Sequence, residues 1–141
     1  MRFPAAVVTL TAMAVVAVGG AAGTFARVVV SELAPPALTV TLAINVVGAF
    51  ALGVVLTVLP EGGAWRREGR RQRRRHHARL LLGPGLCGGF TTYSLIALQV
   101  STLARAGDGV GAMVYPAATL VLGGVATVLG MALGSRGHDG G

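Results

Sequence analysis

The groups in this sequence that could do chemistry are neutral hydroxyls and amides in apolar surroundings. The densest set is the run Gly88-Gly89-Phe90-Thr91-Thr92-Tyr93-Ser94, in the middle of an apolar stretch. Paired glycines weaken a helix, so we expect a break here. A break frees backbone carbonyls, which are tolerated inside a membrane when they are buried in protein or given water or a cation. Half-helix ends form ion sites in membrane proteins; the alternative is a glycine kink without a function.

Two further lines of polar or small residues repeat every four positions, and these are Thr41 with Asn45 and Thr119 with Gly123 and Thr127. That spacing places the members of each line on one face of a helix. An asparagine in lipid is costly unless its amide is satisfied. Asn45 therefore either makes a hydrogen bond between helices or belongs to a row of donors that lines a path for an ion.

The apolar stretches contain no acidic residue and no histidine, because all five carboxylates and all three histidines lie in loops or tails. Proton-coupled transporters usually need such a group within the membrane. A phosphate-binding loop, a carboxylate pair and a metal-ligand cluster are also missing from the sequence. Cys87 is the single cysteine, which excludes an intrachain disulfide and a thiol-rich metal site. The sequence thus gives no basis for an enzyme.

The elements that must position these residues are membrane-spanning helices. Hydrophobic residues make up 53% of the 141 residues and charged residues 12%, about half the charged share of a soluble domain. Four apolar runs, each long enough to cross a bilayer, occupy residues 5–30, 38–59, 80–104 and 110–133. We therefore predict an all-α, polytopic membrane protein, with residues 1–141 as a single membrane domain and residues 61–79 as an arginine-rich loop.

The first run could also be read as a secretory signal peptide, because Arg2 precedes it and small residues follow at 19–23. The apolar run continues past these residues and three more spans follow, which favours a membrane helix. Glycines four residues apart, Gly19 with Gly23 and Gly130 with Gly134, predict close helix–helix contact.

The net charge of +7 comes mainly from one place, since eight of the twelve arginines lie between Arg66 and Arg79. Nucleic-acid binders interleave basic and aromatic residues on a folded face, so we expect no nucleic-acid partner. The positive-inside rule places the arginine-rich loop and both termini in the cytoplasm, with the protein in the inner or plasma membrane. The loop then acts as a topology anchor that also favours anionic headgroups.

The chain resembles the small fluoride channel family known as CrcB or Fluc. The matching pieces are, in order, Gly19-Gly20-Ala21-Ala22-Gly23 with Arg27; Thr41-Leu42-Ala43-Ile44-Asn45 with Gly48, Phe50 and Gly53; and Gly85 with Gly88-Gly89-Phe90-Thr91-Thr92-Tyr93-Ser94. The resemblance implies four-helix subunits with a broken third helix, paired antiparallel into a dimer with two fluoride pores. It also implies passive export of cytoplasmic fluoride and resistance to it.

By the same resemblance, Gly88 and Thr91 would supply backbone carbonyls to a structural sodium ion at the dimer centre. The fluoride path would be lined by neutral donors and an aromatic edge, with an arginine near a vestibule; these are Asn45, Thr41, Tyr93, Ser94, Thr119, Thr127 and Arg27. Fluoride is small and tightly hydrated, so neutral donors and the positive edges of aromatic rings must replace its water.

The chain departs from the family at several positions. Where the family carries two phenylalanines three residues apart, this sequence has Tyr93 and Ile96; the serine and glutamate beyond them are Ala97 and Gln99, and Gly123 stands where a hydroxyl is expected. These changes put in doubt whether both pores conduct. The strong arginine bias also predicts insertion in one orientation, hence a heterodimer with an oppositely oriented paralogue. The alternatives are a small multidrug-type exchanger and a non-conducting partner subunit.

Overall fold

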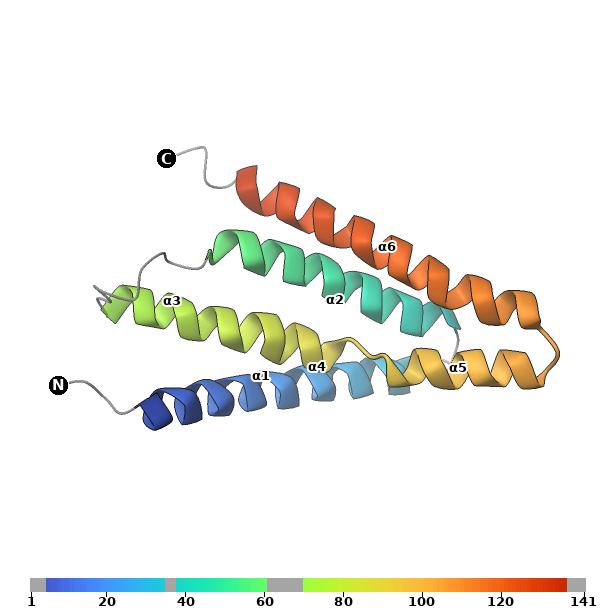
Figure 1. The fold of residues 1–141 in the computed structure, drawn as a ribbon, viewed down its shortest axis with the longest axis horizontal. Coiled ribbons are helices and arrows are strands. Elements are labelled where there is room, and N and C mark those ends of the chain that lie inside the picture. Colours follow the sequence, from blue (N-terminus) through green and yellow to red (C-terminus); the bar gives the residue numbers. More distant parts are fainter. Residues whose placement is uncertain (1–4, 35–37, 61–69, 137–141) are drawn as a thin grey trace.

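The computed structural model of the chain is all-helical, and it describes residues 5–34, 38–60 and 70–136. Four long segments run back and forth along one axis (Figure 1), and each is long and apolar enough to cross a membrane. The elements in chain order are α1 (Ala5–Leu33), α2 (Leu38–Val58), α3 (Arg70–Leu80), the π-helix η1 (Leu81–Cys87), α4 (Gly88–Phe90), α5 (Ser94–Arg105) and α6 (Gly109–Arg136). The four-span prediction is thus confirmed.

The third segment differs from the prediction at its start. We expected a loop up to residue 79, but α3 is helical from Arg70 and runs without interruption into η1. Arginine, glutamine, alanine and leucine are strong helix formers, so the basic run continues the span beyond its apolar part. Residues 70–79 of the predicted arginine-rich loop are therefore helical, and residues 61–69 lie outside the described part of the chain.

The predicted break in the third segment is confirmed. Helix α4 ends at Phe90, the next residue Thr91 has an extended backbone (φ −72°, ψ 158°), and α5 begins at Ser94. In Figure 1 the break appears as the thin loop between α4 and α5. About two turns earlier, Pro84 lies inside the π-helix, where its missing N–H interrupts the regular α-helical ladder.

Glycines hold the helices at backbone contact, as their spacing predicts. A Cβ atom at Gly23 would overlap the Leu86 carbonyl, and one at Gly89 would overlap the backbone of Gly20. The same holds between α2 and α6, where a Cβ at Gly130 would overlap the Phe50 carbonyl. Helix α1 therefore packs against η1 and α4, whereas α2 packs against α6.

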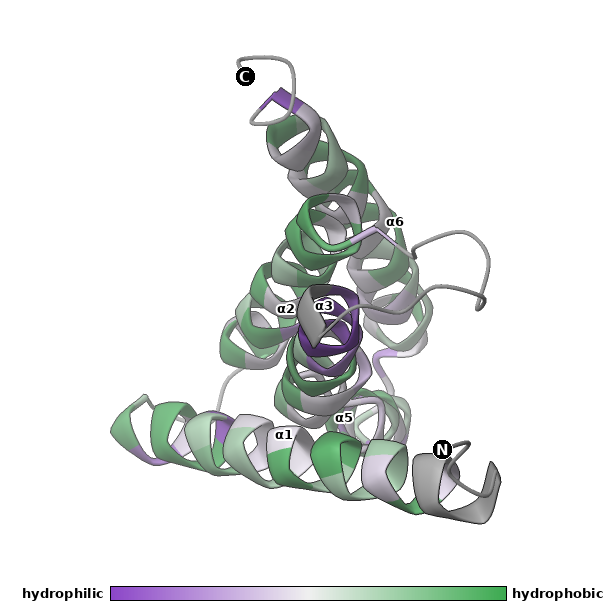
Figure 2. Cartoon of the chain, turned by 90° about the vertical axis from the view of Figure 1, so that its left-hand side faces the viewer, coloured by the Kyte–Doolittle hydropathy of each residue, from purple (hydrophilic) through white to green (hydrophobic). Residues whose placement is uncertain are grey.

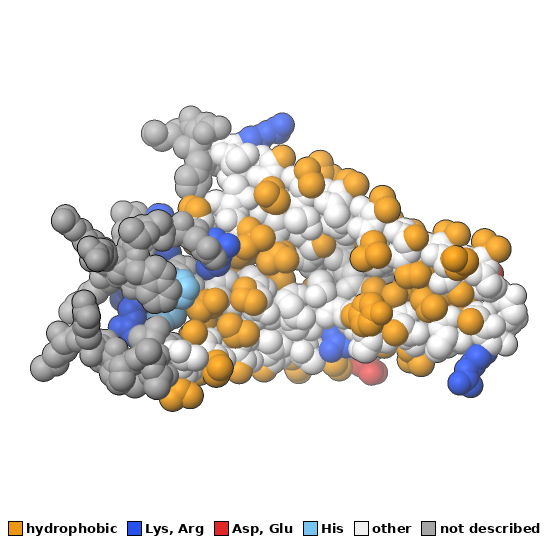
Figure 3. All heavy atoms as spheres, viewed as in Figure 1, with side chains coloured by type: hydrophobic (Ala, Val, Ile, Leu, Met, Phe, Trp, Pro, Cys, Tyr) orange, Lys and Arg blue, Asp and Glu red, His pale blue; other side chains and the backbone are white. Residues whose placement is uncertain are grey.

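Large apolar side chains cover the outside of the bundle (Figure 3). Among the described residues, the buried hydrophobic ones are Ile44, Cys87 and Ala126. A bundle that has lipid as its solvent needs no apolar core, because packing and hydrogen bonds hold its helices together. Figure 2 shows the contrast with α3, the hydrophilic ribbon at one end of the otherwise apolar bundle.

Candidate functional site

The break in the third segment is clamped by the side chain of Asn45. Its Oδ1 accepts the backbone N–H of Thr92 at 2.8 Å, and its Nδ2 donates to the Thr92 carbonyl at 3.2 Å and to the Thr41 carbonyl at 3.0 Å. The side-chain amide of Asn45 thus gives a hydrogen-bond partner to both the N–H and the carbonyl of Thr92, which lies outside the helices. The interhelical hydrogen bond that the sequence left open as one role of Asn45 is present.

At the break, two backbone carbonyls lose the N–H donors that they would have in a regular helix. The Thr92 N–H, which would bond the Gly88 carbonyl in a regular helix, is taken by Asn45. The Leu95 N–H, which would bond the Thr91 carbonyl, instead donates to Thr92 Oγ1 at 3.3 Å. Gly88 is exposed on the single chain, with no atom within 4 Å of the position of a Cβ. Carbonyls of this kind are hard oxygen ligands that suit a small cation.

A hollow of about 310 Å³ opens on the surface beside the break. It is lined by α2, the break, α5 and α6, through Asn45, Ala49, Thr91, Thr92, Tyr93, Ile96, Thr119, Leu120, Gly123 and Gly124. Thr119 is 5% exposed and donates to its own helix at the Tyr115 carbonyl, whereas Tyr93 is 82% exposed. The hollow therefore combines neutral polar groups with an aromatic ring, and it contains no charged side chain.

A second polar cluster continues from Asn45 toward the opposite end of the bundle from α3. Thr41 is 4% exposed, and its Oγ1 accepts Gln99 Nε2 at 2.9 Å. Gln99 Oε1 in turn accepts the hydroxyl of Tyr115, which also lies 3.4 Å from the Leu38 carbonyl. A chain of hydrogen bonds thus joins α6, α5 and α2 to the break.

The other predicted site residues lie around this arrangement. Ser94 is exposed, with its hydroxyl 3.2 Å from that of Thr92. Arg27 is half-buried on α1, and its Nε donates to the Gly89 carbonyl at 3.3 Å. Thr127 lies outside the lining of the hollow and donates to the carbonyls of Gly123 and Ala49 at 3.0 and 3.3 Å, where α6 crosses α2.

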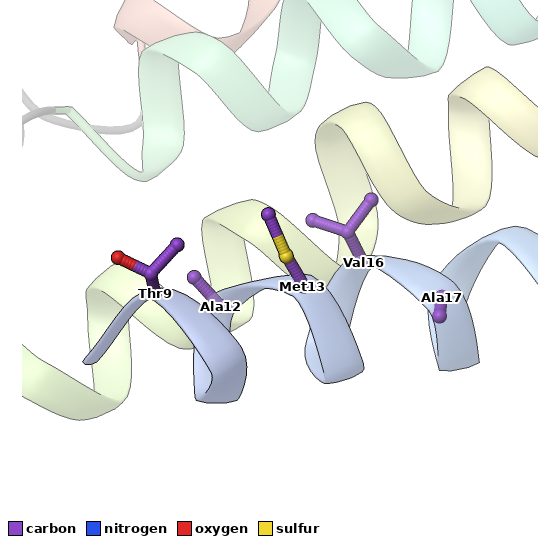
Figure 4. Close-up of a pocket in the computed structure, with 5 residues that line it drawn as sticks. All are labelled: Thr9, Ala12, Met13, Val16 and Ala17. Atoms are coloured by element: carbon purple, nitrogen blue, oxygen red, sulfur yellow. The ribbon is translucent and has the colours of Figure 1, made fainter. Parts of the chain in front are cut away.

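Another hollow, of about 400 Å³, runs along α1 and is lined by Thr9, Ala12, Met13, Val16 and Ala17 (Figure 4). All five residues belong to one helix, and four of them are apolar. Thr9 already has an interaction partner. This hollow lacks the convergent polar groups that an ion requires.

Three residues of the polar clusters were not singled out as sites by the sequence reasoning, and these are Thr92, Gln99 and Tyr115. Thr92 was grouped with the break but not given a role, although it makes most of the contacts to Asn45. Gln99 was noted only as a departure from the family, although an amide in an apolar span is itself a signal of a required partner.

Comparisons with known proteins agree with this architecture. Residues 14–131 match the protein family described as "CrcB-like protein, Camphor Resistance (CrcB)". The chain is 43% identical over 126 residues to "Fluoride-specific ion channel FluC 2" of Leifsonia xyli, covering 87% of this chain and 83% of that protein. It is 42% identical over 125 residues to "Fluoride-specific ion channel FluC 1" of Rhodococcus jostii, covering 88% and 86%.

A third relative extends the match further along the chain. "Fluoride-specific ion channel FluC" of Methylobacterium radiotolerans is 36% identical over 136 residues, which cover 94% of this chain and 90% of that protein. The residues that match the family and its relatives include parts of all four membrane segments and the break between α4 and α5. The chain therefore belongs to the CrcB/FluC fluoride channel family.

Proposed function

We propose that this chain is a subunit of a fluoride-specific ion channel that lets cytoplasmic fluoride leave the cell down its electrochemical gradient. The observation that carries the proposal is the uncharged polar hollow beside the break, held open by the clamp between Asn45 and Thr92. Membership of the CrcB/FluC family supports the choice of fluoride.

The chemistry of the hollow suits a small, strongly hydrated anion. Hydroxyl groups and the edge of the Tyr93 ring can replace water around fluoride without a fixed charge. A full cation beside the path would bind the ion too firmly for rapid exit. Arg27, whose Nε donates to the Gly89 carbonyl at 3.3 Å, is a vestibule residue at the entrance of the path and does not line its narrow part.

A structural sodium ion is the second part of the proposal. The carbonyls of Gly88 and Thr91 are the ligands, and both have lost their helical donors. When bound, the cation would be the partner of these carbonyl oxygens in place of the lost hydrogen-bond donors. The clamp at Asn45 contributes by holding the Thr92 N–H away from the Gly88 carbonyl.

The third part of the proposal is an antiparallel dimer. In a single chain, Gly88 and the hollow face outward, where lipid cannot satisfy polar groups. A second, oppositely oriented subunit covers them. The eight arginines between Arg66 and Arg79 fix this chain with both termini in the cytoplasm, so we expect the partner to be a paralogue with the reverse orientation.

Fluoride efflux from liposomes, recorded with an electrode after addition of a potassium ionophore, tests the proposal. We expect fast fluoride efflux and no chloride efflux when this chain and its paralogue are reconstituted together, with at least tenfold slower efflux for the chain alone. Asn45→Ala should lower efflux at least tenfold, because it releases the clamp. Thr39→Val, an exposed position on the same helix, is the matched control.

Other outcomes identify the alternatives. Transport that requires a proton gradient, with no ionophore-dependent current, would indicate a multidrug-type exchanger. Unchanged efflux after Asn45→Ala in the co-reconstituted pair would indicate that this subunit only completes the dimer. Fast efflux from the chain alone would contradict the heterodimer.

A further inference from the structure

Helix α3 carries a dense positive charge that the channel proposal does not use. Between residues 61 and 79 the sequence holds eight arginines against two glutamates, Glu61 and Glu68. Even if each glutamate paired with one arginine, six positive charges would remain. Arg73, Arg74, Arg75 and His76 are exposed in the structure, and Figure 3 shows the arginine and histidine side chains gathered at this end of the molecule.

The helical form of this segment concentrates the charge. Arg75 and Arg79 are four residues apart on a helix, where like charges repel. The first turn of α3 contains no acidic residue, although the start of a helix favours negative charge. Helix α3 is therefore strained electrostatically unless an anionic partner neutralises it.

The position of α3 identifies that partner by its chemistry. Arg75 lies six residues before Leu81, the start of η1, which places it about 9 Å along the helix axis from the apolar segment. The headgroup layer on each side of a bilayer is about 5–8 Å thick. Long arginine side chains at residues 73–75 therefore reach the depth of lipid phosphates, which pair well with guanidinium groups.

One arginine of the helix has another role and serves as a contrast. Arg79 donates from Nη1 to the Leu59 carbonyl at 3.0 Å, at the end of α2. It thereby satisfies an open carbonyl of that helix and ties α3 to α2. By contrast, Arg74 and Arg75 are exposed on the surface of α3.

We infer that α3 is a binding surface for anionic phospholipid headgroups, held by Arg74 and Arg75 together with the neighbouring basic side chains. The phosphate groups neutralise the mutual repulsion along the helix and so stabilise its helical form. Because α3, η1 and α4 form one uninterrupted segment up to the break, the lipid also holds the near half of the third span at a fixed depth. The inference does not require fluoride conduction.

The test compares the full chain in nanodiscs of phosphatidylcholine alone and with one quarter phosphatidylglycerol. We expect amide hydrogen exchange over residues 70–79 to slow at least fivefold in the anionic bilayer. In native mass spectrometry, wild-type protein should retain phosphatidylglycerol over phosphatidylcholine. The double variant R74Q/R75Q should weaken that retention about twentyfold, since each arginine near the surface contributes about a factor of five.

Arg136→Gln is the matched control, because this exposed arginine ends α6 on the side of the bundle where α3 begins (Figure 1). As a single arginine it should weaken retention by no more than about fivefold, well short of the effect of R74Q/R75Q. Equal retention by R74Q/R75Q and wild type, or equal exchange in both bilayers, would overturn the inference. Protection of residues 70–79 by added transfer RNA in detergent, without an effect of phosphatidylglycerol, would overturn it in favour of a nucleic-acid surface.

Discussion

The two halves of the third span are held in the bundle by different means. The near half, η1 and α4, lies against α1 at backbone contact, with Gly83, Gly85 and Cys87 buried. The far half, α5, has no buried residue among those described and is joined to its neighbours by side-chain hydrogen bonds. Backbone contact tolerates no added atom, whereas hydrogen-bonded side chains can adjust. The groups proposed to bind ions lie where these two kinds of packing meet.

The largest expected effect is on the near half. Gly89→Val should destabilise the folded subunit by about 3 kcal/mol or prevent its folding, because the new side chain would overlap the backbone of Gly20. Thermal unfolding in detergent, followed by size-exclusion chromatography, measures this. Gly124→Val is the control, since no atom lies within 4 Å of a Cβ at that position. Equal tolerance of both variants would show that α1 and α4 are not in backbone contact.

A smaller effect is expected on the far half. Gln99→Leu should cost about 1–2 kcal/mol, because it leaves the Thr41 and Tyr115 hydroxyls without their shared partner. Ser101→Ala, which removes a hydroxyl bonded only to its own helix, is the control. A double-mutant cycle with Tyr115→Phe should give a coupling energy of about 0.5–1 kcal/mol. If the stability effects of Gln99→Leu and Tyr115→Phe simply add, this network does not hold α5 in the bundle.

The smallest effect is expected at the turn that joins α5 to α6. Asp108 Oδ1 accepts the Gly111 N–H at 2.8 Å and so caps the start of α6. Asp108→Ala should lower stability by about 0.5–1 kcal/mol. Asp108→Asn, which keeps an oxygen acceptor, should stay close to wild type in the same unfolding measurement. If Asp108→Ala lowered stability more than Gln99→Leu does, the turn and not the hydrogen-bond network would be the main contact that holds α5 in the bundle.

Much of the site could be predicted from residue types. The pair Gly88-Gly89 predicted the break, because paired glycines weaken a helix. Asn45 predicted a helix with a polar partner, because a lone amide is costly in an apolar span. The partner of Asn45 could not be predicted, since sequence separation does not reveal which of Thr91, Thr92 and Ser94 turns toward α2. Likewise, Thr127 has the right spacing for the polar line, but the crossing of α6 over α2 places it outside the hollow.

By itself, the sequence determined the number of spans, the place of the break and the uncharged character of the spans around it, because each follows from transfer of side chains and backbone into lipid. Only the tertiary structure decided that the Thr92 N–H leaves the Gly88 carbonyl for Asn45 and that Gln99 lies between Thr41 and Tyr115. Both depend on which segments lie side by side, and hydropathy along a single chain carries no information on that.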